Sequence, residues 1–296
     1  MRVLVFGASG FIGRHVVSQL IDDPRVAEVI RIGRSDVDLV RDGVDVLAAV
    51  FERVEPDAVI NCTGRLGGTG HELVVGNTSA TAKLIDAVGL VNPGIRLVRL
   101  GSASEYGPVP YGQAVAEDHP TTPVSEYGVS HLAGTRLVEL ASAAGRVDGV
   151  VLRIFNPIGA GLHEENMLGR AVGLLRDAQR RGERRIELGP LTSYRDFVDV
   201  RDVARAVRAA LMPVGLRRRV FNVGSGRAVT ARHVVEALAA VAGFDGEISE
   251  RGHGPARSAS VDWIEANVTR TRRVLGWSPA YELADSLKAI WADGRA

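Results

Sequence analysis

Residues 2–13 read RVLVFGASGFIG, an apolar run that ends in three glycines spaced three residues apart. The run has the length of a buried strand, and the residues from Phe11 to about Ile21 follow a helical pattern. Because glycine has no Cβ, such a strand–turn–helix lets backbone amides and the positive helix end approach a pyrophosphate. The stretch therefore predicts a dinucleotide site, bound by the turn residues Gly7, Ser9, Gly10, Phe11, Ile12 and Gly13.

The rest of the chain alternates short apolar runs with longer helical patterns, which is typical of βαβ units and a parallel sheet. The short runs are apolar almost throughout, as in strands that are covered on both faces. The sequence therefore predicts an α/β fold with a Rossmann-type doubly wound parallel sheet. We expect strands at 29–32, 58–61, 95–101, 150–155, 185–188 and 220–223, and helices at 77–88, 127–145, 167–179, 197–211 and 230–242.

The pattern loosens after residue 156, which indicates a smaller, mixed C-terminal lobe. We expect residues 1–165 to form the dinucleotide-binding domain, with segments near 194–224 returning to it. Residues 166–193 and 225–296 would form a substrate-binding lobe. The absence of repeats and of obvious flexible linkers suggests that the two lobes are intertwined.

Composition limits the possible partners and locations. The 296 residues carry a formal net charge of +1, which gives no support for a nucleic-acid or acidic-membrane partner. The single cysteine, Cys62, excludes an internal disulfide and a cysteine-based metal cluster, and we expect no metal site. Because no long apolar stretch occurs and the chain starts on a strand-like run, we expect a cytoplasmic protein without a signal peptide.

The residues after the second strand bear on the choice of dinucleotide. This position often carries an acidic residue that binds the adenosine ribose of NAD. Here Arg31, Arg34 and Ser35 offer charge and hydrogen bonds that suit a 2′-phosphate, which favours NADP over NAD. In the alternative, the arginines are only exposed and Asp36 holds the ribose hydroxyls.

A second constellation contains the candidate catalytic groups. Ser102 follows the strand expected at 95–101, and Tyr127 and His131 lie four residues apart at the start of a predicted helix, hence on one face. A phenol can act as general acid toward a carbonyl when a nearby cation lowers its pKa and a hydroxyl polarises the oxygen. We therefore expect Tyr127 to be the acid and Ser102 the polarising hydroxyl.

Together these segments resemble the extended short-chain dehydrogenases/reductases of the NAD-dependent epimerase/dehydratase type, over nearly the whole chain. The matching blocks are NCTG at 61–64, NT at 77–78, LRIFNP at 152–157, YRDFVDVRDV at 194–203, FNVGSG at 221–226 and LGWSP at 275–279. The resemblance implies that Cys62, Thr63, Gly64 and Asn77 line the cofactor. It also implies that Ser104, Asn156 and Arg195 contact the substrate, with Arg195 at its diphosphate, and that the protein is a homodimer.

The chain departs from the family at one catalytic position. The family pattern is Y-x-x-x-K, and here the fourth residue after Tyr127 is His131. The family lysine is expected to hold the nicotinamide ribose and to lower the pKa of the tyrosine by its charge. His131 is either a protonatable substitute that still donates to the ribose, or a sign that catalysis is weakened.

The residues next to Ser102 reduce the number of family reactions that the chain is expected to catalyse. The family's dehydratases have an Asp-Glu pair where this chain has Ala103 and Ser104, and Cys62 is not beside the serine as in the family's epimerase-reductases. The stretch 101–107, with EDHP at 117–120, is most similar to the 4-keto-6-deoxyhexose reductases. The leading hypothesis is an NADPH-dependent reductase of a nucleotide-linked ketosugar. A 4-epimerase with bound NAD and a cofactor-binding sensor or scaffold remain as alternatives.

Overall fold

The computed structural model describes residues 1–251 and 261–293. Its centre is a parallel sheet of six strands in the order β2-β1-β3-β4-β6-β10. Apolar residues fill these strands because both faces of the sheet are covered by helices. The Rossmann-type sheet predicted from the sequence is confirmed, with strands β1 (Arg2–Phe6), β2 (Glu28–Ile32), β3 (Ala58–Asn61), β4 (Arg96–Ser102), β6 (Asp148–Ile154) and β10 (Val220–Val223).

Alternate residues of each strand supply two separate cores. In β1, Val3 and Val5 pack with the helices on one face, and Leu4 and Phe6 pack with those on the other. This alternation follows from the period of two in a strand. The first face is covered by α1 (Phe11–Ile21) and α7 (Val200–Ala210), and the second by α2 (Val44–Val54), α4 (Ala80–Val91) and α5 (Glu126–Ala143).

The chain reverses its direction across the sheet beside β1. It runs from β1 outward to β2 and then crosses back over β1 to β3. In open α/β sheets, ligands bind at such a reversal, outside the carboxyl ends of the strands. Register places Phe6 opposite both Ile32 and Asn61, so the segments after β1, β2 and β3 emerge at one edge.

Two helix predictions need correction. The helix expected over 197–211 begins only at Val200, because Tyr194–Asp199 forms strand β9, and Asp199 Oδ1 caps the helix by accepting from the Arg201 amide at 2.7 Å. The helix expected over 77–88 is preceded by α3 (Gly70–Leu73) and a π-helical turn, η1 (Val74–Ser79). Capping by Thr69 starts this longer stretch.

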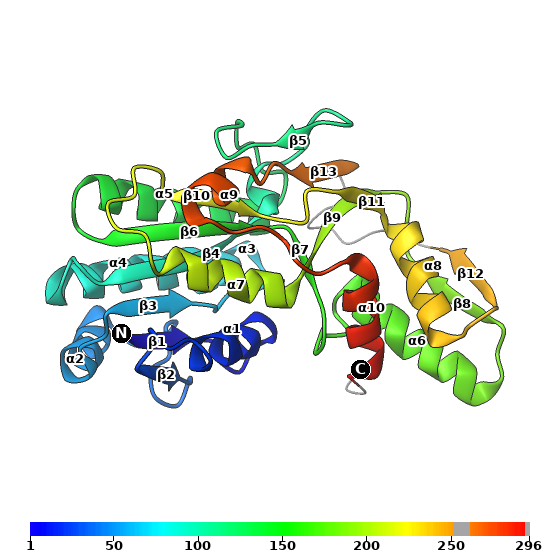
Figure 1. The fold of residues 1–296 in the computed structure, drawn as a ribbon, viewed down its shortest axis with the longest axis horizontal. Helices are drawn as coiled ribbons and strands as arrows, with labels where there is room; N and C mark the ends of the chain where they lie inside the picture. Colours follow the sequence, from blue (N-terminus) through cyan, green and yellow to red (C-terminus); the bar gives the residue numbers. More distant parts are fainter. Residues whose placement is uncertain (252–260, 294–296) are drawn as a thin grey trace.

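The smaller lobe has its own apolar core and lies at one end of the large sheet (Figure 1). Thr230 caps α8 by accepting from the His233 amide, as its hydroxyl suggests. The parallel pair β8–β12 completes this lobe. Its elements are α6 (Met167–Arg181), β8 (Arg185–Leu188), α8 (Ala231–Ala242), β12 (Glu247–Glu250) and α10 (Leu283–Ala292).

Short strands join the two lobes. Strand β9 pairs with β7 (Asn156–Ile158), β11 (Ala228–Thr230) and β13 (Trp263–Ala266), and β13 also pairs with β5 (Ala114–Val115). The chain then returns to the large sheet, since α9 (Thr269–Leu275) lies beside β10 and Trp277 Nε1 donates to the Asp202 carbonyl. Part of the segment 225–296 therefore packs on the dinucleotide-binding side.

Neither a membrane span nor a metal cluster is found in the described ranges. None of the helices there is both long and apolar enough to cross a bilayer. Within the same ranges, no three His, Cys, Asp or Glu side chains are grouped so that they could hold a metal ion.

Candidate active site

The glycine turn lies at the reversal point, and its geometry requires glycine at positions 7 and 13 and leaves little room for a side chain at Gly10. Gly7 has a φ of +73°, and a Cβ there would lie 2.9 Å from the Cys62 carbonyl carbon. A Cβ at Gly10 would lie 3.2 Å from the Gly7 oxygen, and one at Gly13 would lie only 2.0 Å from that oxygen. The turn therefore packs β1, α1 and the end of β3 closely.

This arrangement fits the pyrophosphate of a dinucleotide. Helix α1 starts after Gly10, which has no side chain to cap the first amides. The first turn carries no acidic side chain, so the positive end of the helix dipole is not neutralised there. Free amides and an uncompensated dipole make this helix end suitable for a phosphate. Ser9, Phe11 and Ile12 lie in or directly after the turn, and their contact with the dinucleotide stays a prediction.

Asn61 and Asn77 fix the segment 62–65 that follows β3. The Thr63 amide and hydroxyl both donate to Asn61 Oδ1, at 3.0 and 2.6 Å. The Arg65 amide donates to Asn77 Oδ1, and Asn77 Nδ2 donates to the Arg65 carbonyl and to Ser130 Oγ on α5. Asn77 thus joins this segment to α5, and its side chain is buried. It positions the predicted cofactor-lining residues Cys62, Thr63 and Gly64.

The arginines that favour NADP are exposed at the end of β2. Arg31, Arg34 and Ser35 all face solvent. The Asp36 carboxylate accepts a hydrogen bond from the Gly33 amide at 2.8 Å, so it stabilises its own turn. Arg31 and Arg34 are thus accessible to a ligand, and the contact of either guanidinium with a 2′-phosphate stays a prediction.

Ser102 and Tyr127 lie on segments that pack closely together. Ser102 ends β4, and its hydroxyl accepts from the Ser104 amide at 3.1 Å. Tyr127 is in the first turn of α5, next to Gly128, where a Cβ would lie 2.5 Å from the Ser104 carbonyl oxygen. The missing side chain at 128 thus lets the helix that carries Tyr127 contact the turn that carries Ser102.

The His131 ring packs against the ring of the candidate acid but is not a cation. The Tyr127 and His131 ring centroids are 4.5 Å apart. The His131 ring is buried, and this burial, together with the nearby Arg99 guanidinium, holds its pKa well below the ordinary value of 6.5. The imidazole is therefore neutral at neutral pH. The possibility that His131 replaces the family lysine as a charge is not supported by its surroundings, and its role as a ribose ligand stays a prediction.

A buried neutral histidine should make the fold sensitive to mild acid. The unfolded ring takes up a proton below about pH 6.5, whereas the folded ring stays neutral to lower pH. The stability is therefore complete above pH 6.5 and falls by up to about 1.4 kcal/mol per pH unit below it. Urea unfolding at a series of pH values would measure this slope in the wild type and in His131→Gln. An equal slope in the two proteins would contradict the prediction.

Three buried charged residues behind Ser102 were not among the residues predicted from the sequence. Glu105 lies in the short η2 helix (Ala103–Glu105), and its carboxylate accepts from the Ser102 amide and from Arg153 Nε, at 3.0 and 2.8 Å. Arg153 on β6 and Arg99 on β4 are also buried. The available signal was the presence of arginines in runs expected to be covered on both faces, because a charge buried there needs partners.

The predicted substrate residues follow the same edge of the sheet. Ser102 is opposite Ile154 in the register, so Ser104 and Asn156 follow neighbouring strand ends. Asn156 Nδ2 donates to the Asp196 carbonyl on β9 at 2.9 Å. Arg195 directly precedes Asp196 in β9. Its side chain is partly buried, and its Nη1 donates to the Tyr194 carbonyl. Asn156 therefore joins the strand that carries Arg195 to the end of β6.

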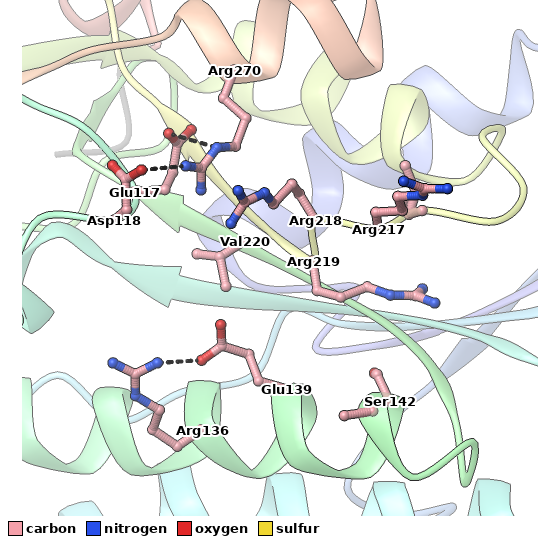
Figure 2. A pocket seen from close by; sticks show the side chains of 12 residues that line it. Glu117, Asp118, Arg136, Glu139, Ser142, Arg217, Arg218, Arg219, Val220 and Arg270 are labelled. Carbon is pink, nitrogen blue, oxygen red and sulfur yellow. Dashed lines mark hydrogen bonds and ion pairs between the residues drawn. The ribbon is translucent and has the colours of Figure 1, made fainter.

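A pocket of about 520 Å³ lies elsewhere, between the second half of α5 and the start of β10 (Figure 2). Because β10 begins there, the pocket is near the amino ends of the strands, and it contains none of the predicted site residues. Figure 2 shows that Arg270 pairs with Glu117 and Asp118 and that Arg136 pairs with Glu139. Much of its charge is thus neutralised within the pocket.

The helices proposed for a homodimer expose some apolar side chains. Leu90 on α4 and Val129 and Leu140 on α5 are more than half exposed, at 72%, 51% and 68%. Such side chains are compatible with an interface between copies, so the homodimer stays a prediction.

The comparisons with known proteins show the family to which the chain belongs. The model of the NAD dependent epimerase/dehydratase family matches residues 3–224. A dTDP-6-deoxy-L-talose 4-dehydrogenase (NAD(P)(+)) from Kitasatospora kifunensis is 37% identical over 303 residues, which covers 98% of this chain and 94% of that protein. A UDP-glucose 4-epimerase from Azospirillum brasilense is 30% identical and covers 97% of this chain and 89% of its own length.

A solved structure supports the same assignment. The structure of RMD from Pseudomonas aeruginosa complexed with NADPH has a TM-score of 0.85 and 26% identity, covering 99% of this chain and 98% of that chain. The match of the family model spans most of the chain and includes the glycine turn, Ser102 and Tyr127. The chain therefore belongs to the NAD dependent epimerase/dehydratase family.

Proposed function

We propose that this enzyme reduces the 4-keto group of a nucleotide-linked 6-deoxysugar with NADPH, and that Tyr127 is the proton donor. The observation that carries the proposal is the close packing of the Tyr127 helix on the Ser102 turn through Gly128. This packing brings the first turn of α5, which carries Tyr127, against the turn that follows Ser102 at the carboxyl edge of the sheet. A carbonyl oxygen bound there could accept hydrogen bonds from the Tyr127 and Ser102 hydroxyls.

Each of three side chains has a separate role in the proposed reaction. When bound, the nicotinamide supplies the hydride that reaches the carbonyl carbon. Ser102 Oγ donates a hydrogen bond to the carbonyl oxygen and stabilises the negative charge that develops on it. The Tyr127 phenol transfers its proton to that oxygen, so the product is an alcohol and the side chain becomes a phenolate. Arg195 binds the diphosphate of the substrate through its guanidinium.

Two features favour simple redox chemistry over the alternatives. Ala103 and Ser104 occupy the positions after Ser102, so the acidic pair expected of a dehydratase is not there. The similar protein from Kitasatospora kifunensis is named as a 4-dehydrogenase of a dTDP-linked 6-deoxyhexose. A dehydrogenase and a reductase catalyse one reaction in opposite directions. The similarity to a GDP-6-deoxy-D-mannose reductase, at 28% identity, also supports a deoxysugar substrate, whereas the nucleotide base differs between these relatives.

The test is to incubate the protein with NADPH and a panel of 4-keto-6-deoxysugar nucleotides and to follow the loss of NADPH absorbance. We expect oxidation of NADPH and formation of the corresponding 4-hydroxy sugar. Interconversion of 4-epimers without net oxidation, by protein purified with NAD bound, would instead support the epimerase. Tight dinucleotide binding without turnover of any substrate in the panel would support the sensor or scaffold.

Removal of Arg34 should change the cofactor preference. If its guanidinium binds the 2′-phosphate, the variant Arg34→Ala loses a charge-assisted contact worth about 1.5–3 kcal/mol. We expect the Kd for NADPH to rise by about tenfold or more, while the Kd for NADH stays nearly constant. Calorimetric titration with both dinucleotides measures this ratio. Arg53→Ala, at the end of α2, is the control for loss of an arginine elsewhere. A parallel loss of NADH affinity would contradict the prediction.

A further inference from the structure

Arg99 lies directly behind the catalytic pair that the proposed function assigns. It extends from β4 between helices α4 and α5, and only 2% of its surface is exposed. Its Nε donates to Thr81 Oγ1 at 3.0 Å, and its Nη1 donates to Thr135 Oγ1 at 3.2 Å. The third contact joins Arg99 Nη2 to His131 Nδ1 at 3.5 Å.

Helix α5 has a gap that accommodates this guanidinium. A Cβ at Gly134 would lie 2.5, 2.7 and 2.8 Å from Arg99 Nη2, Cζ and Nε. Gly134 follows His131 by three residues and therefore lies on the same side of the helix. The glycine lets the positive group reach the helix face that carries His131 and, one turn earlier, Tyr127.

The buried cluster of Arg99, Arg153 and Glu105 carries more positive than negative charge. Arg153 binds Glu105 at 2.8 Å, with both side chains at most 2% exposed. Glu105 also accepts from Thr135 Oγ1 and the Ser102 amide. Arg99 forms no ion pair with any carboxylate in the described part of the chain, since its hydrogen-bond partners there are two hydroxyls and a neutral imidazole. Arg99, Arg153 and Glu105 together thus comprise two guanidinium groups and one carboxylate, and the carboxylate pairs with Arg153.

The remaining charged side chains near the cluster do not remove this excess. Glu117 lies beyond Arg153 and pairs with Arg270, 3.3 Å away (Figure 2). Burial lowers the pKa of Arg99, whereas Glu105 and an ionised Tyr127 oppose this effect and Arg153 adds to it. The groups that face Arg99 are therefore Glu105, Arg153, His131 and Tyr127. Because electrostatic interactions are reciprocal, a cation that is stabilised by the Tyr127 phenolate stabilises that phenolate equally.

Arg99 also determines which nitrogen of His131 carries the proton. Arginine can only donate hydrogen bonds, so the Nδ1 atom that faces it must act as acceptor. The proton of the neutral ring is then on Nε2, which is free to donate elsewhere. A single ammonium can both donate a hydrogen bond and supply charge, whereas a neutral imidazole can donate a hydrogen bond but supplies no charge.

We infer that Arg99 is a positioning residue that supplies, from behind the helix, the positive charge that favours the Tyr127 phenolate, while it holds His131 as a neutral Nε2–H donor. The inference rests on the proposed role of Tyr127 as the proton donor. It divides between two side chains the two tasks expected of a lysine at position 131.

The direct test is the titration of the Tyr127 phenol, followed by ultraviolet absorbance in the whole protein without substrate. The difference between each protein and its Tyr127→Phe counterpart isolates this tyrosine. In Arg99→Gln, the midpoint should rise by about one to two pH units because a buried positive charge that favours the phenolate has been removed. Arg99→Lys keeps the charge and should leave the midpoint nearly unchanged. Equal midpoints in the wild type and Arg99→Gln would overturn the inference.

Arg99→Gln should remain folded, because the Arg153–Glu105 pair is balanced without Arg99. Thermal unfolding of both Arg99 variants separates a packing defect from a charge effect. A merely structural role would lower the stability of Arg99→Gln and Arg99→Lys without changing the phenol midpoint. That result would also overturn the inference.

A second comparison exploits the contact between Arg99 and position 131. His131→Lys alone places an ammonium against the guanidinium, so we expect a lower unfolding temperature. Arg99→Gln combined with His131→Lys removes this repulsion and restores one cation near Tyr127. The double variant should therefore be more stable than His131→Lys, and its phenol midpoint should return to within a few tenths of a pH unit of the wild type. Strictly additive effects would contradict the proposed division of tasks.

These outcomes are distinct from failure of the proposed function. The titration requires neither substrate nor turnover, so a midpoint shift without ketosugar reduction would refute the reductase and leave the charge role of Arg99 intact. Conversely, ketosugar reduction by the wild type together with an unchanged phenol midpoint in Arg99→Gln would support the reductase and refute the charge role of Arg99.

Discussion

The variant Tyr127→Phe is expected to lose nearly all ketosugar reduction while it still binds NADPH. The substitution removes only the hydroxyl, so the ring contact with His131, at 4.5 Å between centroids, can persist. General acid catalysis typically contributes about 10²–10⁴-fold, and we expect kcat to fall by that factor. Steady-state rates of NADPH oxidation measure the loss, and NADPH titration shows whether the cofactor site is preserved.

The matched control is Tyr111→Phe. Tyr111 lies in a separate aromatic group with Tyr194 and Trp263, and 69% of its surface is exposed. Removal of its hydroxyl should leave kcat within about twofold of the wild type, since surface changes of this kind have small effects. Rapid NADPH oxidation that persists in Tyr127→Phe would exclude the phenol as proton donor.

The variant Gly13→Ala is expected to lose dinucleotide binding. The new Cβ would lie 2.0 Å from the Gly7 carbonyl oxygen, so α1 must move away from the turn that it starts beside. Overpacking of this kind costs about 1–3 kcal/mol or more in stability. The amides that are to face the pyrophosphate move with the helix. We expect the Kd for NADPH to rise by on the order of a hundredfold, equivalent to about 2.7 kcal/mol.

Gly67→Ala provides the control for this substitution. An added Cβ at Gly67 would meet nothing within 4 Å. Both variants restrict the unfolded chain equally, so a difference between them reports on the folded turn. Fluorescence titration with NADPH, together with thermal unfolding, separates lost binding from lost folding. Equal affinity in Gly13→Ala and the wild type would show that the turn does not contact the dinucleotide.

The large sheet could be predicted from the sequence because its signals are local. Strand β3 spans the predicted Ala58–Asn61, and α1 spans the predicted Phe11–Ile21. Glycine spacing also located the turn that packs α1 on the end of β3. Such features depend on backbone conformation and on burial of short runs, which neighbouring residues largely determine.

The helices and strands in the second half of the chain were harder to predict from the sequence. Residues 197–199 have a helical pattern that continues into α7, but they form the end of β9. Their pairing with Asn156–Ile158 joins segments about forty residues apart and overrides the local preference. No local pattern reveals a partner at that distance.

The sequence by itself determined the family fold, the dinucleotide turn and the side chains Ser102, Tyr127 and His131 as candidates. Only the tertiary structure decided the state of His131 and revealed Arg99 beside it and the Arg153–Glu105 pair behind Ser102. Protonation depends on burial and on charges that arrive from other strands. Those distances are set when β4 and β6 pack beneath α5, and no spacing along the chain contains them.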